Sequence, residues 1–174
     1  MTFRRAAARD LDRIAEIYSE IHDAEEAGRT AIGWVRSIYP TRATAEAALG
    51  KGTLYVEEID GRIVAAAKID QEQVPEYADA AWTQDAPADQ VLVLHALTVS
   101  PAQSGKGYGS AFVRFYEETA QKRGCPYLRM DTNEKNAAAR ALYRKLGYAE
   151  IGIVSCVFNG IPGVRLVCLE KTLV

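Results

Sequence analysis

The residues with the clearest chemical potential are the three glycines at alternate positions in Gly105-Lys106-Gly107-Tyr108-Gly109-Ser110. This run follows an apolar segment, 91–99, and precedes a helix-like pattern that begins near Gly107. Glycine has no Cβ and accepts positive φ, so the backbone amides can approach a bound group closely. The first amides of a helix have no intrahelical partner and lie at the positive end of its dipole. The spacing therefore predicts an anion site, for which phosphate is the usual occupant.

Cysteine and histidine are too sparse for a metal centre. Cys125, Cys156 and Cys168 are widely spaced, no Cys-x-x-Cys pair occurs, and the chain has two histidines. Zinc sites and disulfide frameworks need a denser pattern. We expect no bound metal and no covalent cysteine chemistry, because no cysteine has a visible activating partner. Small buried thiols are typical of a reducing cytoplasm.

Composition and charge restrict the class of protein. The chain has 174 residues, of which 48% are hydrophobic and 25% charged, and its formal net charge is −2. Nucleic-acid and anionic-membrane partners usually require a basic excess, so we expect neither. No apolar run approaches the roughly 20 residues that span a bilayer, and no segment resembles a signal peptide. We expect a cytoplasmic protein with one domain over residues 1–174.

Hydrophobic periodicity and turn residues predict an α/β unit. The apolar run at 91–99 is typical of a central strand covered on both faces, and Asp60-Gly61 is typical of a two-residue hairpin turn. Further strands are expected at 3–7, 54–59, 63–69, 126–130, 151–157 and 164–169, with turns at Asn159-Gly160 and Pro162-Gly163. Helices are expected from an N-cap at Asp10, within 41–49, from Gly107 to Gly124 and from Asn136 to Leu146, with a loop at 71–90.

Two other phosphate-binding motifs fit the glycines less well. A Walker A loop would need a Gly-Lys-Ser/Thr ending that Lys106 does not provide. A dinucleotide fingerprint would have its third glycine one position later, where Ser110 stands. Asp131, about 20 residues further on, imitates the ribose-binding acid of that fold. Too little chain follows Gly109 for the repeated β-α-β units of a dinucleotide domain, so this interpretation remains the less favoured alternative.

Two segments together resemble the GNAT N-acetyltransferases. Leu97-Thr98-Val99-Ser100-Pro101, followed by the glycine run, is similar to the acyl-CoA motif of that family. The segment from Asn136 to Tyr148, with Leu146-Gly147-Tyr148 at its end, resembles the family's second motif. The resemblance implies a mixed, mostly antiparallel twisted sheet of six to seven strands, flanked by about four helices. It also implies transfer of an acetyl group from acetyl-CoA to a primary amine, by direct attack in a ternary complex.

The same resemblance implies where coenzyme A would bind. Its pyrophosphate would lie on the loop amides, and its pantetheine arm would pair with a strand edge that splays from its neighbour. The family usually has Gln or Arg before the first glycine, where this chain has Ser104, so we expect the main-chain amides to provide most contacts. The implied cofactor-binding residues are Leu97, Thr98, Val99, Ser104, Gly105, Lys106, Gly107, Tyr108, Gly109, Ser110 and Asn136.

Tyr143 and His95 are the candidate catalytic residues. Tyr143 matches the family tyrosine that protonates the departing sulfur, although its helical stripe also fits a core aromatic. His95 is the first candidate base because the pKa of histidine lies near neutrality. Regular strand alternation would place His95 on the face of Leu97 and Val99, which fits a core histidine equally well. Weaker candidate bases are Glu25, Glu26, Glu57 and Glu58.

The acceptor pocket is expected from residues 22–39, from the strand ends near Gln71 and Gln73, and from the turn at 153–162. The candidate substrate residues are His22, Trp34, Arg36 and Gln71. The sequence does not name the amine, which would be a small molecule or a peptide. A homodimer through the closing strands is compatible with the pattern. A catalytically quiet acyl-CoA-binding module is the main alternative to an enzyme.

Overall fold

The computed structural model describes residues 1–173, in which seven strands form one sheet. The spatial order is β1-β2-β3-β4-β5-β7-β6. The strands are β1 (Thr2–Arg5), β2 (Leu54–Ile59), β3 (Arg62–Asp70), β4 (Val91–Val99), β5 (Tyr127–Asn133), β6 (Ala149–Phe158) and β7 (Ile161–Thr172). Within these residues only the β4–β5 pair is parallel. The predicted mixed, mostly antiparallel sheet is therefore confirmed.

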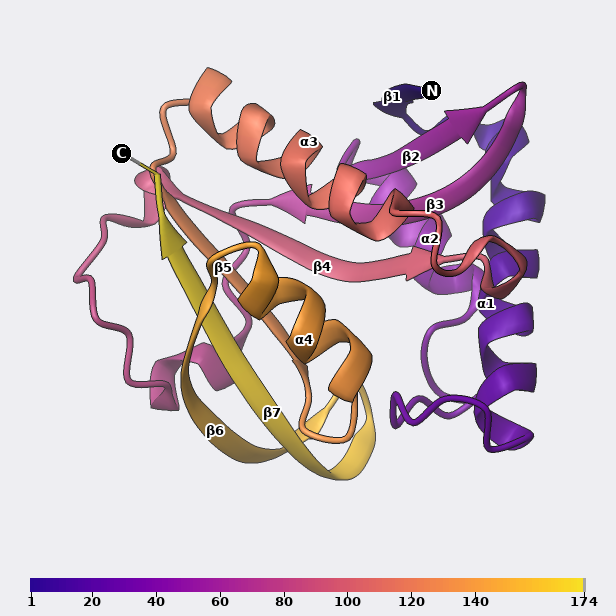
Figure 1. Cartoon of the computed structure of the whole chain (residues 1–174). Coiled ribbons are helices and arrows are strands. Elements are labelled where there is room, and N and C mark those ends of the chain that lie inside the picture. The colour runs from indigo at the N-terminus through magenta and orange to yellow at the C-terminus, as the bar shows by residue number, and fades with distance from the viewer. Residues whose placement is uncertain (174) are drawn as a thin grey trace.

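Helices cover both faces of this sheet (Figure 1). They are α1 (Leu11–Glu26), α2 (Arg42–Gly50), α3 (Tyr108–Lys122) and α4 (Ala137–Lys145). Short 3₁₀ turns are η1 (Ala8–Asp10), η2 (Pro75–Asp79), η3 (Ala88–Gln90) and η4 (Pro101–Gln103). None of the helices in residues 1–173 combines the length and apolar composition that a membrane crossing requires.

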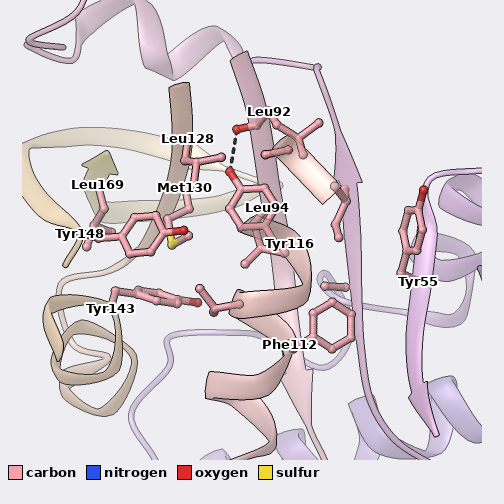
Figure 2. Close-up of a cluster of buried hydrophobic side chains, with 14 of the residues drawn as sticks. Tyr55, Leu92, Leu94, Phe112, Tyr116, Leu128, Met130, Tyr143, Tyr148 and Leu169 are labelled. Carbon is pink, nitrogen blue, oxygen red and sulfur yellow. Dashed lines mark hydrogen bonds between the residues drawn. The ribbon is translucent and has the colours of Figure 1, made fainter. Parts of the chain in front are cut away.

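The core on the α3 side is built around aromatic side chains (Figure 2). Phe112 and Tyr116 of α3 are fully buried against Leu92 and Leu94 of β4. The Tyr116 hydroxyl donates to the Leu92 carbonyl at 2.6 Å, so its burial leaves no unpaired hydroxyl group. On the opposite face, α1 contributes a separate apolar cluster that packs on β2 and β3. This double cover explains the near-continuous apolar sequence of β4.

β4 and β5 pair only at their beginnings and then separate. Their parallel register runs from Val91 and Tyr127 to Leu94 and Met130. Beyond that point β5 pairs with β7 alone, and β4 pairs with β3 alone. Figure 1 shows the two strands diverging, with α4 close to the opening. The splayed strand edge that the sequence resemblance implied is present.

A β-bulge interrupts β4 within the splayed part. Lys68 pairs with His95 and Ala66 with Thr98, so two residues of β4 oppose one residue of β3. Ala96, in the bulge, has a φ of 50°, a left-handed conformation that is uncommon outside glycine. The bulge reverses the alternation of side chains along the strand.

Two local predictions are corrected by the structure. Asp10 does not cap α1 with its side chain; its carboxylate accepts from the Ala7 amide at 2.7 Å and from Arg4. Pro162-Gly163 is not a turn, because it lies inside β7, and Asn159-Gly160 alone closes the β6–β7 hairpin. The segment 71–90 is irregular, as expected, with two 3₁₀ turns, and it delivers the buried Tyr77 to the sheet.

Candidate active site

A cavity of about 630 Å³ opens where β4 and β5 separate. Residues of both strands, of α4, of the α1–α2 region and of the β6–β7 turn line it. Several predicted residues meet there even though they are distant in sequence: His95, Leu97, Thr98, Val99, Ser104, Asn136 and Tyr143. Trp34, predicted for the acceptor side, also lines this cavity.

The glycine loop, whose preceding residue Ser104 lines the cavity, has the geometry of an anion site. Gly105 and Gly107 have φ values of 77° and 85°, which glycine adopts without strain. Gly109 has a different reason to be glycine, since a Cβ there would lie 3.3 Å from Leu142 Cδ2 of α4. The amides from Gly105 to Ser110 have no hydrogen-bond acceptor among the described residues. They can therefore bind an external anion.

The chain's residues fit a long phosphate-bearing thioester carrier such as acetyl-CoA. The loop offers unpartnered amides, and the adjoining edge of β4 offers backbone groups that no strand pairs on the β5 side. Asn136 borders the same path, where its Oδ1 accepts from the Ala139 amide and caps α4. Lys106 and Tyr108 do not line this cavity; they line a second groove together with residues of α1 and of the β2–β3 hairpin.

Tyr143 reaches the cavity from the α3–α4 side of the sheet. Its side chain is 6% exposed and packs edge-on against Tyr148 at a centroid distance of 6.2 Å (Figure 2). The Tyr143 hydroxyl has no hydrogen-bond partner within residues 1–173, but it keeps some accessible surface. The Tyr148 hydroxyl, in contrast, is both fully buried and without a partner. Burial, and secondarily the Asp131 carboxylate, raise the pKa of Tyr143. Tyr143 is thus a neutral donor facing the cavity.

His95 lies at the cavity with a carboxylate behind it. Its Nε2 is 3.1 Å from Oδ1 of Asp70, the last residue of β3. An ionised carboxylate only accepts, so this contact assigns the ring proton to Nε2 and leaves Nδ1 as an acceptor. Burial alone would raise the pKa of Asp70, but the hydrogen bond with His95 and the charge of Lys68 bring that pKa below its ordinary value. This arrangement suits a proton acceptor that becomes an imidazolium ion.

The expected face of His95 was wrong. Leu97 and Val99 pack on the α3-side core together with Leu92 and Leu94. The bulge at Ala96 reverses the alternation, so His95 lies on the opposite face from Leu97. A single sequence gives no signal for this bulge. Asp70 was missed as the partner of His95 because the two residues are diagonal neighbours across β3 and β4, which depends on the strand register.

Asp131 of β5 is the other residue that sequence reasoning did not place in an active site. It lines the cavity, and its Oδ2 accepts from the Tyr77 hydroxyl at 2.7 Å. The dinucleotide interpretation had given it the role of a ribose ligand. The antiparallel neighbours of β4 and β5 are incompatible with the parallel sheet which that interpretation requires.

Three predicted substrate residues do not line the cavity. His22 is buried, with its Nε2 2.9 Å from the Pro40 carbonyl, where it links α1 to the following segment. Arg36 forms ion pairs with Asp23 and Glu26 at the surface. Gln71 donates to the Asp89 carbonyl at 2.7 Å and lies outside the cavity. Other residues of the predicted segment 22–39, among them Trp34 and Tyr39, line the cavity, whereas these three side chains point elsewhere.

The four weaker candidate bases also lie outside the cavity lining. Glu25 accepts from the Ile32 and Gly33 amides and so fixes the segment after α1. Glu26 pairs with Arg36 and Glu58 with Arg4. Glu57 is buried on β2, with neither carboxylate oxygen hydrogen-bonded.

The thiols are unsuited to nucleophilic chemistry. Burial raises the pKa of Cys125 and Cys156, and it raises the pKa of Cys168 to about 12. Thiolate is the reactive form, so these cysteines are protonated at neutral pH. No group of acidic, histidine or cysteine side chains in the described part of the chain is arranged to hold a metal ion.

Comparison with known proteins agrees with this geometry. The family model described as the acetyltransferase (GNAT) family matches residues 11–148. Streptothricin acetyltransferase from Streptomyces lavendulae is 32% identical over 72 residues, which are 41% of this chain and 38% of that protein. The acetyl transferase GW6a from Oryza sativa subsp. japonica is 42% identical over 67 residues, which are 38% of this chain and 16% of that protein. The matches thus span well under half of both curated relatives.

Solved structures share the fold along nearly the whole chain. A GNAT-family acetyltransferase from Streptococcus agalactiae superposes with a TM-score of 0.81 at 25% identity, covering 98% of this chain and 94% of that one. An acetyltransferase from Salmonella typhimurium, solved with acetyl-CoA, superposes with a TM-score of 0.68 at 23% identity, covering 100% and 94%. The family model spans most of the residues that build the splayed strands, the glycine loop and α4. The chain therefore belongs to the GNAT acetyltransferase family.

Proposed function

We propose that this chain transfers an acetyl group from acetyl-CoA to a primary amine, by direct attack in a ternary complex. The observation that carries the proposal is a path along β4 and the loop that follows it. His95, Leu97 and Ser104 line the cavity together with Tyr143, the edge of β4 is free on the β5 side, and the unpartnered amides of residues 105–110 follow Ser104 directly. Acetyl-CoA supplies the acetyl group as a thioester when it is bound.

Each residue along this path has a separate task. The amides of residues 105–110 hold the diphosphate, and backbone N–H groups near Leu97 polarise the carbonyl on which negative charge develops. His95 Nδ1 accepts a proton from the amine, and Asp70 stabilises the imidazolium ion that results. Tyr143 donates its hydroxyl proton to the departing sulfur from the opposite face of the sheet.

The curated relatives support the same reaction class. One is a streptothricin acetyltransferase, so streptothricin is one acceptor found among similar proteins. Because the matched segment is short, the acceptor of this chain is defined by its own cavity and not by that name. Release of free thiol from acetyl-CoA in the presence of a panel of primary amines tests the proposal. Coenzyme A binding by calorimetry, without thiol release for any amine, would instead support a catalytically quiet module.

A further inference from the structure

His95 and Asp131 are the first residues beyond the point where β4 and β5 part. The last paired residues of the parallel register are Leu94 and Met130, so His95 and Asp131 face each other across the apex of the cleft. Strand alternation places both side chains on the face that Tyr77 covers. Tyr143 belongs to the core of the other face. The apex is therefore bordered by a base and a carboxylate on one side and by a hydroxyl donor on the other.

The Asp131 carboxyl group forms no ion pair with a cation of the described residues. Its Oδ2 accepts from Tyr77, but its Oδ1 accepts no hydrogen bond, and no Lys, Arg or His within residues 1–173 forms an ion pair with it. Oδ1 is not fully buried, and it is open to the cavity that Asp131 lines. A partly buried carboxylate of this kind is stabilised by an external cation. Burial raises the pKa of Asp131, which a bound cation would counteract.

The two lysines of the cavity are already paired. Lys68 lies 3.1 Å from Asp70 and 2.8 Å from Glu72, and Lys51 lies 3.3 Å from Glu72. Arg29, which follows α1 and also lines the cavity, forms no ion pair within residues 1–173. A carboxylate on the carbon next to the bound amine would lie beside Asp131, and the two negative charges would repel each other.

Three aromatic side chains contribute to the rest of the cavity lining. Trp34 and Tyr39 meet edge-on at a centroid distance of 6.0 Å, and Phe158 lines the cavity from the end of β6. Such a wall accommodates an uncharged or aromatic substrate body, and its ring faces favour cations.

We propose that Asp131, held by Tyr77, binds the acceptor amine as an ammonium ion and selects amines that carry no carboxylate on the adjacent carbon. This inference rests on the proposed acetyl transfer and deepens it by naming the substrate class. Before attack, one N–H bond of the ammonium breaks, its proton passes to His95 Nδ1, and the electron pair stays on the amine nitrogen. Asp131 is then a specificity-determining residue next to the base.

The test uses matched amines that differ in one carboxylate. 2-Phenylethylamine is L-phenylalanine without its carboxylate, and agmatine is L-arginine without its carboxylate; each has a single primary amine. Binding of all four to the full chain saturated with coenzyme A is measured by calorimetry, independently of turnover. We expect each decarboxylated compound to bind at least about ten-fold more tightly than its partner, since unpaired like charges oppose binding.

Asp131→Asn should weaken binding of 2-phenylethylamine and agmatine by about ten-fold or more and remove the preference over the amino acids. Glu76→Gln is the matched control, because it removes a nearby carboxylate that does not line the cavity, and it should leave the preference unchanged. Tyr77→Phe, which removes only the hydroxyl that holds Oδ2, should show a smaller loss in the same direction. Tyr77→Phe also provides the test of the ammonium site if Asp131→Asn does not fold.

Three results overturn the inference: equal affinity for both members of each pair, unchanged affinity in Asp131→Asn, or no binding of any of the four compounds to the wild type. Thiol release measured in parallel separates this inference from the proposed function. Asp131-dependent amine binding without thiol release refutes acetyl transfer and leaves the ammonium site standing. Thiol release that is indifferent to Asp131 refutes the ammonium site alone.

Discussion

Asp70 at the end of β3 and His95 on β4 form a hydrogen-bonded pair, with Oδ1 and Nε2 3.1 Å apart, at the apex of the splayed strands. Lys68 pairs with His95 and Asp70 with Val93, so Asp70 and His95 are diagonal neighbours on one face of the sheet, and the β-bulge at Ala96 puts Leu97 on the other face. The carboxylate fixes the tautomer of the ring and compensates the positive charge that it acquires. The pair is therefore the centre of the proposed proton transfer.

Asp70→Asn should lower kcat by about ten-fold or more while leaving the KM for acetyl-CoA unchanged, because a base loses its orientation and its counter-charge. His95→Ala should lower kcat by at least as much. If the two residues act as one unit, the double variant should be little worse than His95→Ala alone. Steady-state kinetics of the three variants check this. Additive losses would show that Asp70 does not act through His95.

Tyr143→Phe should lower kcat by about ten-fold or more and leave acetyl-CoA binding nearly intact, the effect of losing a general acid. Tyr148→Phe is a matched control because the Tyr148 ring packs against Tyr143, whereas its buried hydroxyl has no partner. Removing that hydroxyl should leave kcat unchanged and stability unchanged or higher. Equal activity losses in both variants, or none in either, would remove Tyr143 from the mechanism.

The order of the elements was readable from the sequence, and the reasons are local. Asp60-Gly61 marked the β2–β3 hairpin, and the glycines marked the beginning of α3. Gly147, with a φ of 86°, ends α4 as its C-terminal glycine, which the sequence also predicted. Each of these features depends on a few consecutive residues whose conformational preferences are strong.

The contacts of the proposed acid–base residues were not readable, because they depend on register across strands. His95 meets Asp70 as a diagonal neighbour across β3 and β4, and no residue type marks that register. Asp131 is held by Tyr77, which comes from a segment without hydrophobic periodicity. Of the predicted acceptor residues, Trp34 lines the cavity and His22 points to Pro40, which depends on how the segment after α1 folds back.

Gly107→Ala should weaken coenzyme A binding and destabilise the protein by about 1–2 kcal/mol, because an L-residue is strained at the φ of 85° found there. A Cβ at this position would meet no heavy atom within 4 Å, so the effect comes from the backbone and not from a clash. Gly50→Ala is the matched control, since Gly50 lies in α2 without positive φ and its Cβ would also meet nothing within 4 Å. That variant should be neutral or stabilising.

Calorimetry with coenzyme A and urea unfolding of both glycine variants check this prediction. Lost stability of Gly107→Ala with unchanged affinity for coenzyme A would mean that the loop amides do not hold the diphosphate. Weakened binding in Gly107→Ala but not in Gly50→Ala would support the loop as the anion site.

Glu57 makes stability depend on pH. It is fully buried, neither carboxylate oxygen has a partner, and burial raises its pKa from 4.5 to about 7. Between these two values the folded protein binds more protons than the unfolded chain, so this group's contribution to stability falls as pH rises. The loss is complete above about pH 7. A shift of this size corresponds to about 3 kcal/mol.

Glu57→Gln removes the titrating group, so the free energy of unfolding of the variant minus that of the wild type should increase by up to about 3 kcal/mol between pH 4.5 and pH 8. Urea unfolding at these two values measures the difference and cancels the titration of all other groups. Glu118→Gln, at an exposed position of α3, should show no such change. A difference between Glu57→Gln and the wild type that stays constant with pH would mean that Glu57 ionises in the folded protein as it does in water.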